Sequence, residues 1–581
     1  MSGLPNSRGP DHDPVVESFT PKLVGADIEL GNFILGLERP GGTGYEASRA
    51  LLRNVAGVPN RRSLGGGWSN GGYAGYSMGA SHGASTYNVQ DWGRKFLPGN
   101  GGCCYIDLDH LEICTPEVLG ARDHVAVCHA MLRIARNALD AANEQLPDDL
   151  TLIALANNSD GQGNSYGSHY SFLISRRLWD DLFHQKMHPM LFVLLAYQVS
   201  SIVFTGQGKV GSENGQPPVD YQLSQRADFF ETLVGEQTTY RRPLVNARNE
   251  PLCGSPCHGD GESLPGDDLA RLHTIFFDHT LCHVAGYLRT GVMQLVLAMI
   301  ESGRSNPGLI LEDPLSALHE WSRDPDLRVR CKLSDGRIVT AVEHQLLFLE
   351  EVKSFVETDA CAASVPDAAD IVAVWQDTLV KLEKRDFEAL SGRLDWVLKR
   401  GLIERAIGER PELTWDSPAI KHLDLMYGNL DERMGLYWAC ERSGVVERLV
   451  SDDEIERFVC NPPEDTRAWM RAMLLRKAGA DAIETVDWDK ISFWTRRDGV
   501  AWRRHRTLRL DNPLGFTRAD CEISLQEAES LDDLLDDLGA SDPSGCSPGV
   551  LAHNSNGREH ERPGSGVLPG PGNPARTFGS N

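Results

Sequence analysis

The chain has 581 residues, 41% hydrophobic and 24% charged, a composition typical of a folded globular protein with more than one domain. Its formal net charge of -25 argues against nucleic acid as the main partner, because binding phosphate backbone requires clustered Lys and Arg. Residues 1–19 lack the pattern of an export signal, and the most apolar run, residues 190–204, is too short to span a bilayer. We therefore expect a cytoplasmic protein without a membrane partner, whose thirteen cysteines are mostly reduced.

The first predicted element is a strand over residues 24–31. Side chains of a strand alternate between its two faces, so Asp27 and Glu29 point one way while Ile28 and Leu30 point the other. One face is apolar enough to be buried, and the opposite face carries carboxylates.

Residues 32–99 form a long connection after this strand. Residues 46–55 have a helical pattern, but residues 63–85 are dense in Gly, Ser and Tyr, a composition that cannot pack a core. We expect residues 32–99 to contain a flexible loop that covers the acidic surface. An insertion without a role is the alternative.

A second acidic strand is predicted at residues 105–109. Tyr105, Asp107 and Asp109 would share one face, and Glu112 follows shortly afterwards. Two such strands side by side would gather four or more carboxylates, which raise each other's pKa unless a cation lies among them. Oxygen ligands suit Mg²⁺, which usually arrives with nucleotide phosphates. Two ordinary edge strands with solvated polar faces are the alternative.

Helices and strands alternate irregularly through the middle of the chain. Helical patterns cover residues 120–145, 178–204, 269–302 and much of 340–410, and strands are predicted at 150–155 and 171–175. This order favours an α+β fold, in which helices cover one face of an antiparallel sheet and leave the other face wet for chemistry.

The C-terminal part is predicted to form a separate small domain. It begins near residue 446 and contains a helix at 468–477 and an acidic amphipathic helix at 525–538, which either docks on its own domain or binds a partner. The predicted boundaries are a disordered tail at 1–20, a catalytic domain at 21–445, the small domain at 446–540 and a disordered tail at 541–581.

Several motifs, taken in order, are similar to those of one family. They lie at residues 25–31, 100–117, 157–169, 223–228, 246–251, 271–273, 461–468 and 485–488. The chain resembles the Pup ligase and Pup deamidase/depupylase family, which belongs to the glutamine synthetase-like carboxylate–amine ligases. The resemblance implies a large α+β domain with an antiparallel sheet backed by helices, a small C-terminal domain, and ATP and Mg²⁺ as cofactors.

The resemblance also implies roles for individual residues. Asp107 matches the catalytic aspartate, a base towards lysine in the ligase and the nucleophile or water-orienting group in the hydrolase, and Arg248 matches an arginine near the reacting carboxyl. The positions that match metal ligands are Asp27, Glu29, Tyr105, Glu112 and His169, and those that match nucleotide or phosphate contacts are Thr115, Trp488 and His273. Without the family, both histidines and the tryptophan would be interpreted as core residues.

The chain departs from the family pattern beside the expected site. Asp27 replaces a glutamate and shortens the reach to a metal, and Cys103 replaces an arginine, so that a phosphate contact is lost. Tyr170 and Leu252 replace a glutamate and a histidine of the family motifs. These changes indicate a divergent member whose substrate need not be Pup itself.

The long connection at residues 32–99 favours the depupylase branch. We expect an ATP- and Mg²⁺-dependent amidase or isopeptidase that acts at the C-terminal Gln or Glu side chain of a small, acidic, Pup-like modifier or its conjugates. The alternatives are a ligase that forms the same isopeptide bond or a related ATP-dependent phosphotransferase, and a non-catalytic nucleotide-binding protein of the same fold. An acidic modifier requires a local positive strip on the enzyme, for which the candidates are Arg176, Arg177, Arg241, Arg242, Arg496, Arg497, Arg503, Arg504 and Arg506.

Overall fold

A computed structural model of the protein describes most of the chain outside its termini. The described residues are 19–60, 92–184, 189–250, 252–253, 269–495 and 504–541. Outside them lie residues 1–18 and 542–581, which make up most of the predicted tails at 1–20 and 541–581, the Gly/Ser/Tyr-rich segment at 63–85, and Arg496, Arg497 and Arg503. The predicted domain boundaries remain predictions.

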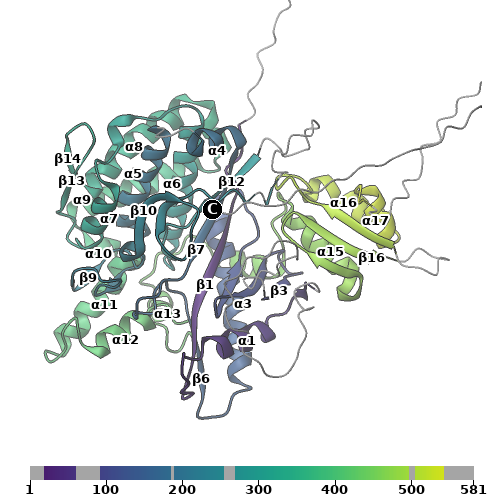
Figure 1. Ribbon diagram of the computed structural model, residues 1–581, viewed down its shortest axis with the longest axis horizontal. Coiled ribbons are helices and arrows are strands. Elements are labelled where there is room, and N and C mark those ends of the chain that lie inside the picture. The colour runs from purple at the N-terminus through teal and green to yellow at the C-terminus, as the bar shows by residue number, and fades with distance from the viewer. Residues whose placement is uncertain are drawn as a thin grey trace, which may run out of the picture. The chain divides into compact units, whose positions relative to one another are not determined.

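An antiparallel sheet of eight strands organises the large domain (Figure 1). Its order is β12 (Leu269–Thr274), β7 (Ser168–Ser175), β1 (Val24–Leu35), β5 (His110–Cys114), β4 (Cys103–Asp107), β3 (Trp92–Phe96) and β2 (Val58–Pro59), and β6 (Thr151–Leu155) pairs with the second half of β1. β1 is therefore central, with β7 on one side and β5 on the other.

The two faces of the sheet differ as the alternation of the sequence predicts. Val24, Ile28 and Leu30 of β1 are fully buried, whereas Asp27 and Glu29 lie on the opposite face and line a cavity. On the apolar side, α1 (Gly44–Asn54) and α3 (Ala121–Asn143) pack against the sheet. Burial of one face fixes the register of the strand, because a slip of one residue would bury the carboxylates.

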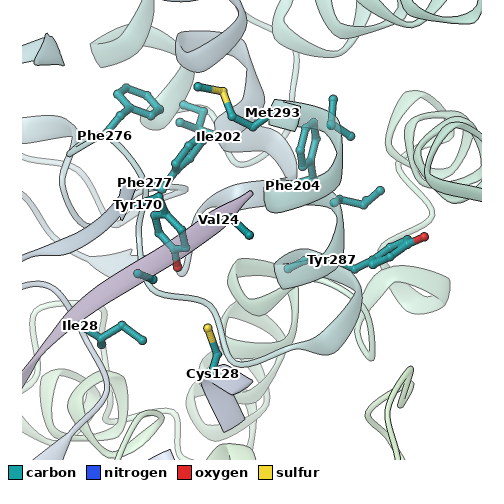
Figure 2. Packing of buried hydrophobic residues seen from close by; sticks show 14 of the residues in the cluster. Val24, Ile28, Cys128, Tyr170, Ile202, Phe204, Phe276, Phe277, Tyr287 and Met293 are labelled. Carbon is teal, nitrogen blue, oxygen red and sulfur yellow. The ribbon is translucent and has the colours of Figure 1, made fainter. Parts of the chain in front are cut away.

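The core continues from the sheet into buried helices. Figure 2 draws part of it, with Val24, Ile28 and Tyr170 from the sheet and Cys128 from α3. α5 (Pro189–Thr205) and α6 (His283–Glu301) complete this core. α6 is the one helix among the described residues that is long and apolar enough to cross a membrane, and its apolar window is entirely buried inside the protein.

Further helices and short strands complete the fold. The helices are α4 (Arg176–Phe183), α7 (Pro314–Ser322), α8 (Ala341–Thr358), α9 (Ala368–Lys384), α10 (Phe387–Leu390), α11 (Asp395–Glu409), α12 (Pro418–Met426), α13 (Leu436–Arg442) and α14 (Asp452–Cys460). The short strands are β8 (Lys209–Val210), β9 (Tyr221–Gln222), β10 (Phe230–Gly235), β11 (Arg242–Asn246), β13 (Arg330–Lys332) and β14 (Ile338–Thr340).

A second hydrophobic core lies in the C-terminal part. It is built from α15 (Ala468–Ala482), the sheet β15 (Ile483–Val486), β16 (Lys490–Thr495) and β17 (Arg504–Arg509), α16 (Arg518–Glu527) and α17 (Leu531–Asp537). Val58, Phe96, Cys103 and Cys114 of the large sheet also belong to this core. Leu534 and Leu535 of α17 are fully buried, and Asp532 pairs with Arg506 at 3.2 Å. The acidic helix therefore docks on its own domain, which selects one of the two sequence-based alternatives.

Three predictions of local structure were wrong. Residues 269–282 are not helical, because Leu269–Thr274 pairs with β7 as an edge strand and α6 begins only at His283. Asp109 does not share a strand face with Asp107, because β4 ends at Asp107 and Leu108 and Asp109 form a turn with φ of 42° and 70°. The two acidic strands are not neighbours, since β5 lies between β1 and β4.

The predicted helix at 525–538 is also divided. Residues up to Glu527 belong to α16, and α17 begins at Leu531 after a break. Ser530 starts α17 with a capping box, in which its hydroxyl accepts from the backbone of Asp533 and the Asp533 carboxylate accepts from the backbone of Ser530. The leucine stripe, from Leu531 to Leu538, lies in α17 and its C-cap, so the break falls before the stripe.

Candidate active site

Strand register brings the acidic residues together. Glu29 of β1 lies opposite Glu112 of β5, and Glu112 lies opposite Tyr105 of β4. Asp27, two residues before Glu29 and on the same face, lies opposite His169 of β7. Side chains directly opposite on one sheet face have Cβ atoms about 5 Å apart, so these rows form one continuous polar surface.

Three carboxylates form an acid cluster, which consists of Glu29, Asp107 and Glu112. One oxygen from each lies within 4.8 Å of the others, and the Tyr105 hydroxyl donates to Glu112. Burial raises the pKa of Glu112 well above its usual value, and the charges of Asp27 and Glu29 raise it further. A divalent cation would offset this cost, and three oxygen donors fit the ligand preference of Mg²⁺.

A histidine cluster, which consists of Asp27, His169 and His273, lies beside the acid cluster. Its ligand atoms also fall within 4.8 Å of one another, with 3.6 Å between His169 Nδ1 and Asp27 Oδ2. Burial raises the pKa of Asp27, but the opposing charge and hydrogen bond of His169 outweigh it and hold this pKa at about 2. An ionised carboxylate beside two imidazoles is a second set of donors suited to a metal ion.

The protonation state of His273 supports a metal or phosphate site at the histidine cluster. Burial and the nearby Arg271 lower the pKa of His273 well below its usual value, so the imidazole is neutral, the form that ligates metals. Neither ring nitrogen has a hydrogen-bond partner among the described residues. Buried polar atoms are normally satisfied, and a bound ion or phosphate would supply the partner here.

All the candidate residues named from the sequence line one cavity of about 340 Å³, which we call the active-site cavity. They are Asp27, Glu29, Tyr105, Asp107, Glu112, Thr115, His169, Arg248, His273 and Trp488. Arg94, Arg271 and Arg467 also line the cavity, so it joins carboxylates to guanidinium groups. Such a pairing of charges suits a metal ion together with an anionic ligand such as phosphate.

Gly167 allows the side chains of His169 and Glu29 to lie directly against the backbone. A Cβ at this position would lie 2.5 Å from His169 Nε2 and 2.9 Å from Glu29 Oε1. Any larger residue would push into both clusters, so the glycine in the segment before β7 is required by packing.

Trp488 also lines the cavity and packs against two neighbours. Its ring meets Phe96 edge to face with centroids 5.3 Å apart, and the Arg471 guanidinium lies 4.8 Å from its centroid. Thr115 is fixed as well, because its hydroxyl accepts from the Ala26 backbone N–H at 2.8 Å. A half-buried aromatic face in a polar cavity can stack on a planar base.

Glu117 connects the C-terminal part to the sheet and was not singled out as a site residue from the sequence. It accepts from Arg467 at 2.8 Å and also pairs with Arg471, and all three side chains are buried. Burial raises the pKa of Glu117, but the two arginines outweigh this and lower it to about 2. The motif at 461–468, which contains Arg467, was the available signal.

Arg248 and Arg271 share one carboxylate. Arg248 lies 3.3 Å from Glu250, and Arg271 lies 2.8 Å from the other oxygen of the same group. The pairing orients both guanidinium groups at the cavity wall, beside the histidine cluster.

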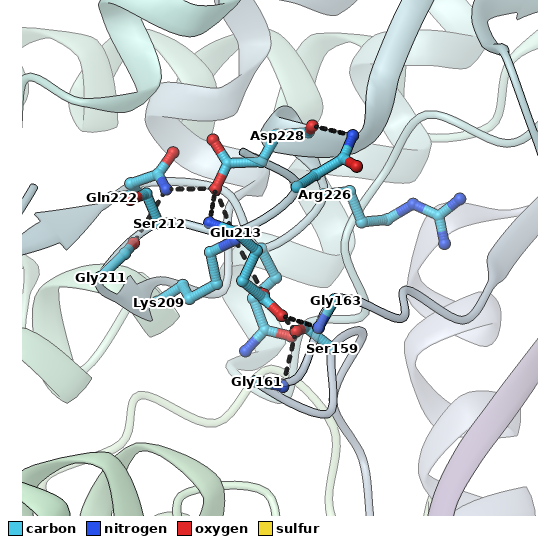
Figure 3. Close-up of polar contacts among 12 residues, drawn as sticks. Ser159, Gly161, Gly163, Lys209, Gly211, Ser212, Glu213, Gln222, Arg226 and Asp228 are labelled. Carbon is cyan, nitrogen blue, oxygen red and sulfur yellow. Dashed lines mark hydrogen bonds and ion pairs between the residues drawn. The ribbon is translucent and has the colours of Figure 1, made fainter. Parts of the chain in front are cut away.

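A buried polar network holds the segment at residues 157–166 (Figure 3). Asp228 accepts from Lys209 at 2.9 Å and from Gln222 at 2.7 Å. Glu213 accepts from Lys209 at 3.0 Å, from the Gly163 N–H at 3.0 Å and from the Ser159 hydroxyl. Glu213 thereby holds a glycine-rich segment in place by hydrogen bonds, because the segment has few side chains that could pack against the rest of the protein.

Comparisons with known proteins agree on one family. The model of the Pup-ligase protein family matches residues 73–492. A depupylase of Acidothermus cellulolyticus is 36% identical over 438 residues, which cover 75% of this chain and 82% of the relative. A Pup–protein ligase of Acidimicrobium ferrooxidans is 35% identical over 408 residues, which cover 69% of this chain and 84% of the relative.

Solved structures show the same fold. The complex between the prokaryotic ubiquitin-like protein Pup and its ligase PafA has a TM-score of 0.69 at 23% identity, and the match covers 90% of this chain and 94% of that chain. PafA in complex with ADP has a TM-score of 0.62 at 26% identity, with 74% and 89% covered. The chain has a PafA-like α+β fold, and it belongs to the Pup-ligase protein family, whose members include depupylases and Pup ligases.

Proposed function

We propose that the protein is a cytoplasmic, ATP- and Mg²⁺-dependent amidohydrolase of the depupylase type. It would cleave an amide or isopeptide bond at the C-terminal Gln or Glu side chain of a small, acidic, Pup-like modifier. One observation carries the proposal: Asp107 lines the same cavity as Glu29 and Glu112, the histidine cluster and a set of guanidinium groups. A reactive carboxylate, metal donors and anion donors are thereby combined in one place.

Glu29 and Glu112 of the acid cluster, together with Asp27, Tyr105 and His169, would hold Mg²⁺, and Thr115 and Trp488 would contact the nucleotide. Bound Mg²⁺ would supply positive charge that orients phosphates and stabilises developing negative charge. Arg248, fixed by Glu250, would bind the carboxyl or carboxamide group that reacts. These residues prepare the cavity for a substrate whose C-terminal residue carries an anionic α-carboxylate beside the reacting side chain.

Asp107 would act on the carbonyl carbon, either as the nucleophile or as the base that orients water. It is the last residue of β4, immediately before the turn at Leu108 and Asp109, so its position is set by a rigid strand. A carboxylate fixed in this way has little reorganisation to undergo on reaching the reactive geometry.

A second cavity of about 1100 Å³ offers room for the polypeptide substrate. Glu29 lines both cavities, and the second is also lined by Leu108, Tyr240, Arg241 and Arg242. Leu108 and Tyr240 are more than half exposed, which suits contact with a disordered chain that folds on binding. Arg241, which is exposed at this wall, would favour an acidic modifier.

Ligation is the second candidate, because Pup–protein ligases match the chain almost as closely as depupylases do. In that direction Asp107 would deprotonate an attacking lysine, and the modifier glutamate would first receive phosphate from ATP. The long connection at residues 32–99, the feature we associate with the depupylase branch, favours hydrolysis.

Three incubations with Mg-ATP test these alternatives. A Pup ending in Gln and an isopeptide-linked Pup conjugate should be cleaved, as followed by mass spectrometry, with little release of phosphate. If the enzyme is a ligase, incubation with a Pup ending in Glu and a lysine-bearing target protein should instead release phosphate from ATP stoichiometrically with conjugation. Nucleotide binding with neither reaction would refute both catalytic proposals and leave a binding protein of the same fold.

A further inference from the structure

Two buried arginines, Arg226 and Arg242, hold the segment that leads into β7. Arg226 is fully buried and donates to the carbonyl oxygen of Tyr166 at 2.6 Å. Arg242 is the first residue of β11, is 7% exposed and lines the second cavity. It donates to the carbonyl oxygens of Ser165 at 3.0 Å and Thr238 at 2.7 Å. Both guanidinium groups therefore bind neutral oxygen atoms.

No carboxylate pairs with either guanidinium among the residues that the structure describes. Aromatic rings flank them, with the centroid of Phe229 5.9 Å from Arg242 and that of Phe230 6.0 Å from Arg226. In Figure 3 the Arg226 side chain points away from the polar network drawn there. Burial and the nearby charge of Arg242 lower the pKa of Arg226 to about 9, so Arg226 is still positively charged at neutral pH.

Several polar atoms of this group have no hydrogen-bond partner within the described part of the chain. They are Nε and Nη2 of Arg226 and the hydroxyl of Ser165, all of which are buried, and Nη1 of Arg242. Buried charges are normally paired with an opposite charge, and buried donors normally have an acceptor. An anion bound at this wall of the second cavity would supply both.

The acidic residues nearby do not fill this need. Among them, Glu29 raises the pKa of Arg242 most, against the effect of burial, but its carboxylate belongs to the acid cluster, where bound Mg²⁺ would take up its charge. Glu231, which also acts on Arg242, is exposed to solvent. Asp278 acts on Arg226, but its carboxylate accepts from backbone N–H groups. The two arginines therefore require a further anion once a metal ion is bound.

We propose that Arg242, reinforced by the charge of Arg226, binds the free α-carboxylate of the modifier's C-terminal residue. The inference rests on the proposed function, because it takes as the ligand a modifier that reacts through the side chain of that residue. The site would select this linkage, since a modifier joined to its target through the α-carboxyl would have no anion to place here.

The two cavities adjoin where this carboxylate would lie. Glu29 lines both of them, and Asp107 lines the active-site cavity while the next residue, Leu108, lines the second. A chain bound in the second cavity can thus present its C-terminal side chain to Asp107 while its α-carboxylate stays at Arg242. Arg242 does not line the active-site cavity, where the nucleotide contacts are expected, which favours a carboxylate of the polypeptide over a nucleotide phosphate.

The test compares two Pup peptides that end in Glu, one with a free α-carboxylate and one with an α-carboxamide. Their affinities for the wild-type protein are measured by calorimetry with Mg-ADP, so that neither hydrolysis nor phosphate transfer consumes the peptide. The carboxamide should bind about tenfold more weakly or worse, the typical effect of losing a charged hydrogen bond. Arg242→Met should bind both peptides equally, at about the affinity of the wild type for the carboxamide.

Two further variants separate recognition of the carboxylate from packing and from general attraction. Arg242→Lys keeps the charge with fewer donors and should retain part of the preference. Arg241→Met is the matched control, because Arg241 is an exposed neighbour at the same cavity. It should weaken binding of both acidic peptides by the same factor and leave their ratio unchanged. ADP affinity should be the same in all these variants.

The outcomes distinguish this inference from the proposed function. Equal affinity of the wild type for the two peptides overturns the inference without any variant, even if Arg242→Met does not fold. A preference that persists in Arg242→Met, or a loss of ADP affinity in that variant, also overturns it. If the wild type prefers the carboxylate through Arg242 but cleaves neither a Pup ending in Gln nor a conjugate, the carboxylate site stands and the hydrolase proposal fails.

Discussion

Glu29 on β1 and Glu112 on β5 lie directly opposite each other on the cavity face of the sheet. Like charges at such positions destabilise a sheet. Burial destabilises the charged form of Glu112 further, which is why its pKa is raised. The strand pairing nevertheless keeps both groups in place, because Ile28 and Leu30 on the other face are fully buried. The core thus holds carboxylates in an arrangement that a divalent cation would stabilise.

The first prediction concerns Glu112→Gln, which removes one of the opposed charges and retains the shape. Without metal the variant should be as stable as the wild type or more stable, because the repulsion with Glu29 is relieved. Mg²⁺ should raise the melting temperature of the wild type through binding to the folded state and should raise that of the variant less. Thermal unfolding with and without Mg²⁺ measures both effects. A variant that is less stable in the absence of metal would contradict this account of the acid cluster.

The second prediction concerns Asp107→Asn. Turnover should be abolished because the amide is neither a nucleophile nor a base, while affinity for Mg-ATP should stay within about tenfold. Single-turnover cleavage of a Pup conjugate and nucleotide calorimetry provide the two measurements. Asp140→Asn, at an exposed position of α3, is the matched control and should retain full activity. Full activity in Asp107→Asn would remove this residue from the mechanism.

Local alternation was sufficient to predict the faces of β1. Asp27 and Glu29 alternate with Ile28 and Leu30, and the structure turns these pairs to opposite sides. The same reasoning failed at Asp109, where a turn of left-handed residues ended the strand two residues early. Alternation specifies the face on which a residue lies but not where the strand stops.

Pairing between strands distant in sequence determines features that the local sequence pattern did not predict. His273 lies on a strand because Leu269–Thr274 completes the edge of the sheet beside β7, although its apolar residues also fitted a helical pattern. Arg94 lies at the end of a connection predicted to be a flexible loop, and only its pairing with β4 brings it to the cavity. The order of strands, with β5 between the acidic strands, likewise depends on contacts between segments distant in sequence.

The third prediction concerns Glu117, which joins the sheet to Arg467 and Arg471. Its pKa is lowered to about 2 from a usual 4.5, so its contribution to stability is fully present above pH 4.5 and is lost as the pH falls towards 2. The shift corresponds to about 3 kcal/mol. Glu117→Gln should therefore be destabilised at pH 7 and should lose less stability than the wild type between pH 5 and pH 3.

Urea unfolding at several pH values measures this difference. Glu464→Gln is a matched control, because Glu464 pairs with Arg518 on the surface, where a salt bridge contributes little. Parallel stability curves for the wild type and Glu117→Gln over pH 3–5 would contradict the importance of the buried pairs.

The fourth prediction concerns Glu213, whose carboxylate accepts from Ser159, Gly163 and Lys209. Glu213→Gln should free the segment that contains Gly163, which lines the second cavity, and leave the expected nucleotide contacts at Thr115 and Trp488 unchanged. Hydrogen exchange at residues 159–165 should accelerate. KM for a Pup conjugate should rise severalfold at unchanged ATP affinity, because substrate binding would then have to order the segment at an entropic cost. Glu409→Gln, at the exposed end of α11, is the control. A loss of ATP affinity equal to the rise in KM would instead show that the network supports the whole site rather than the second cavity alone.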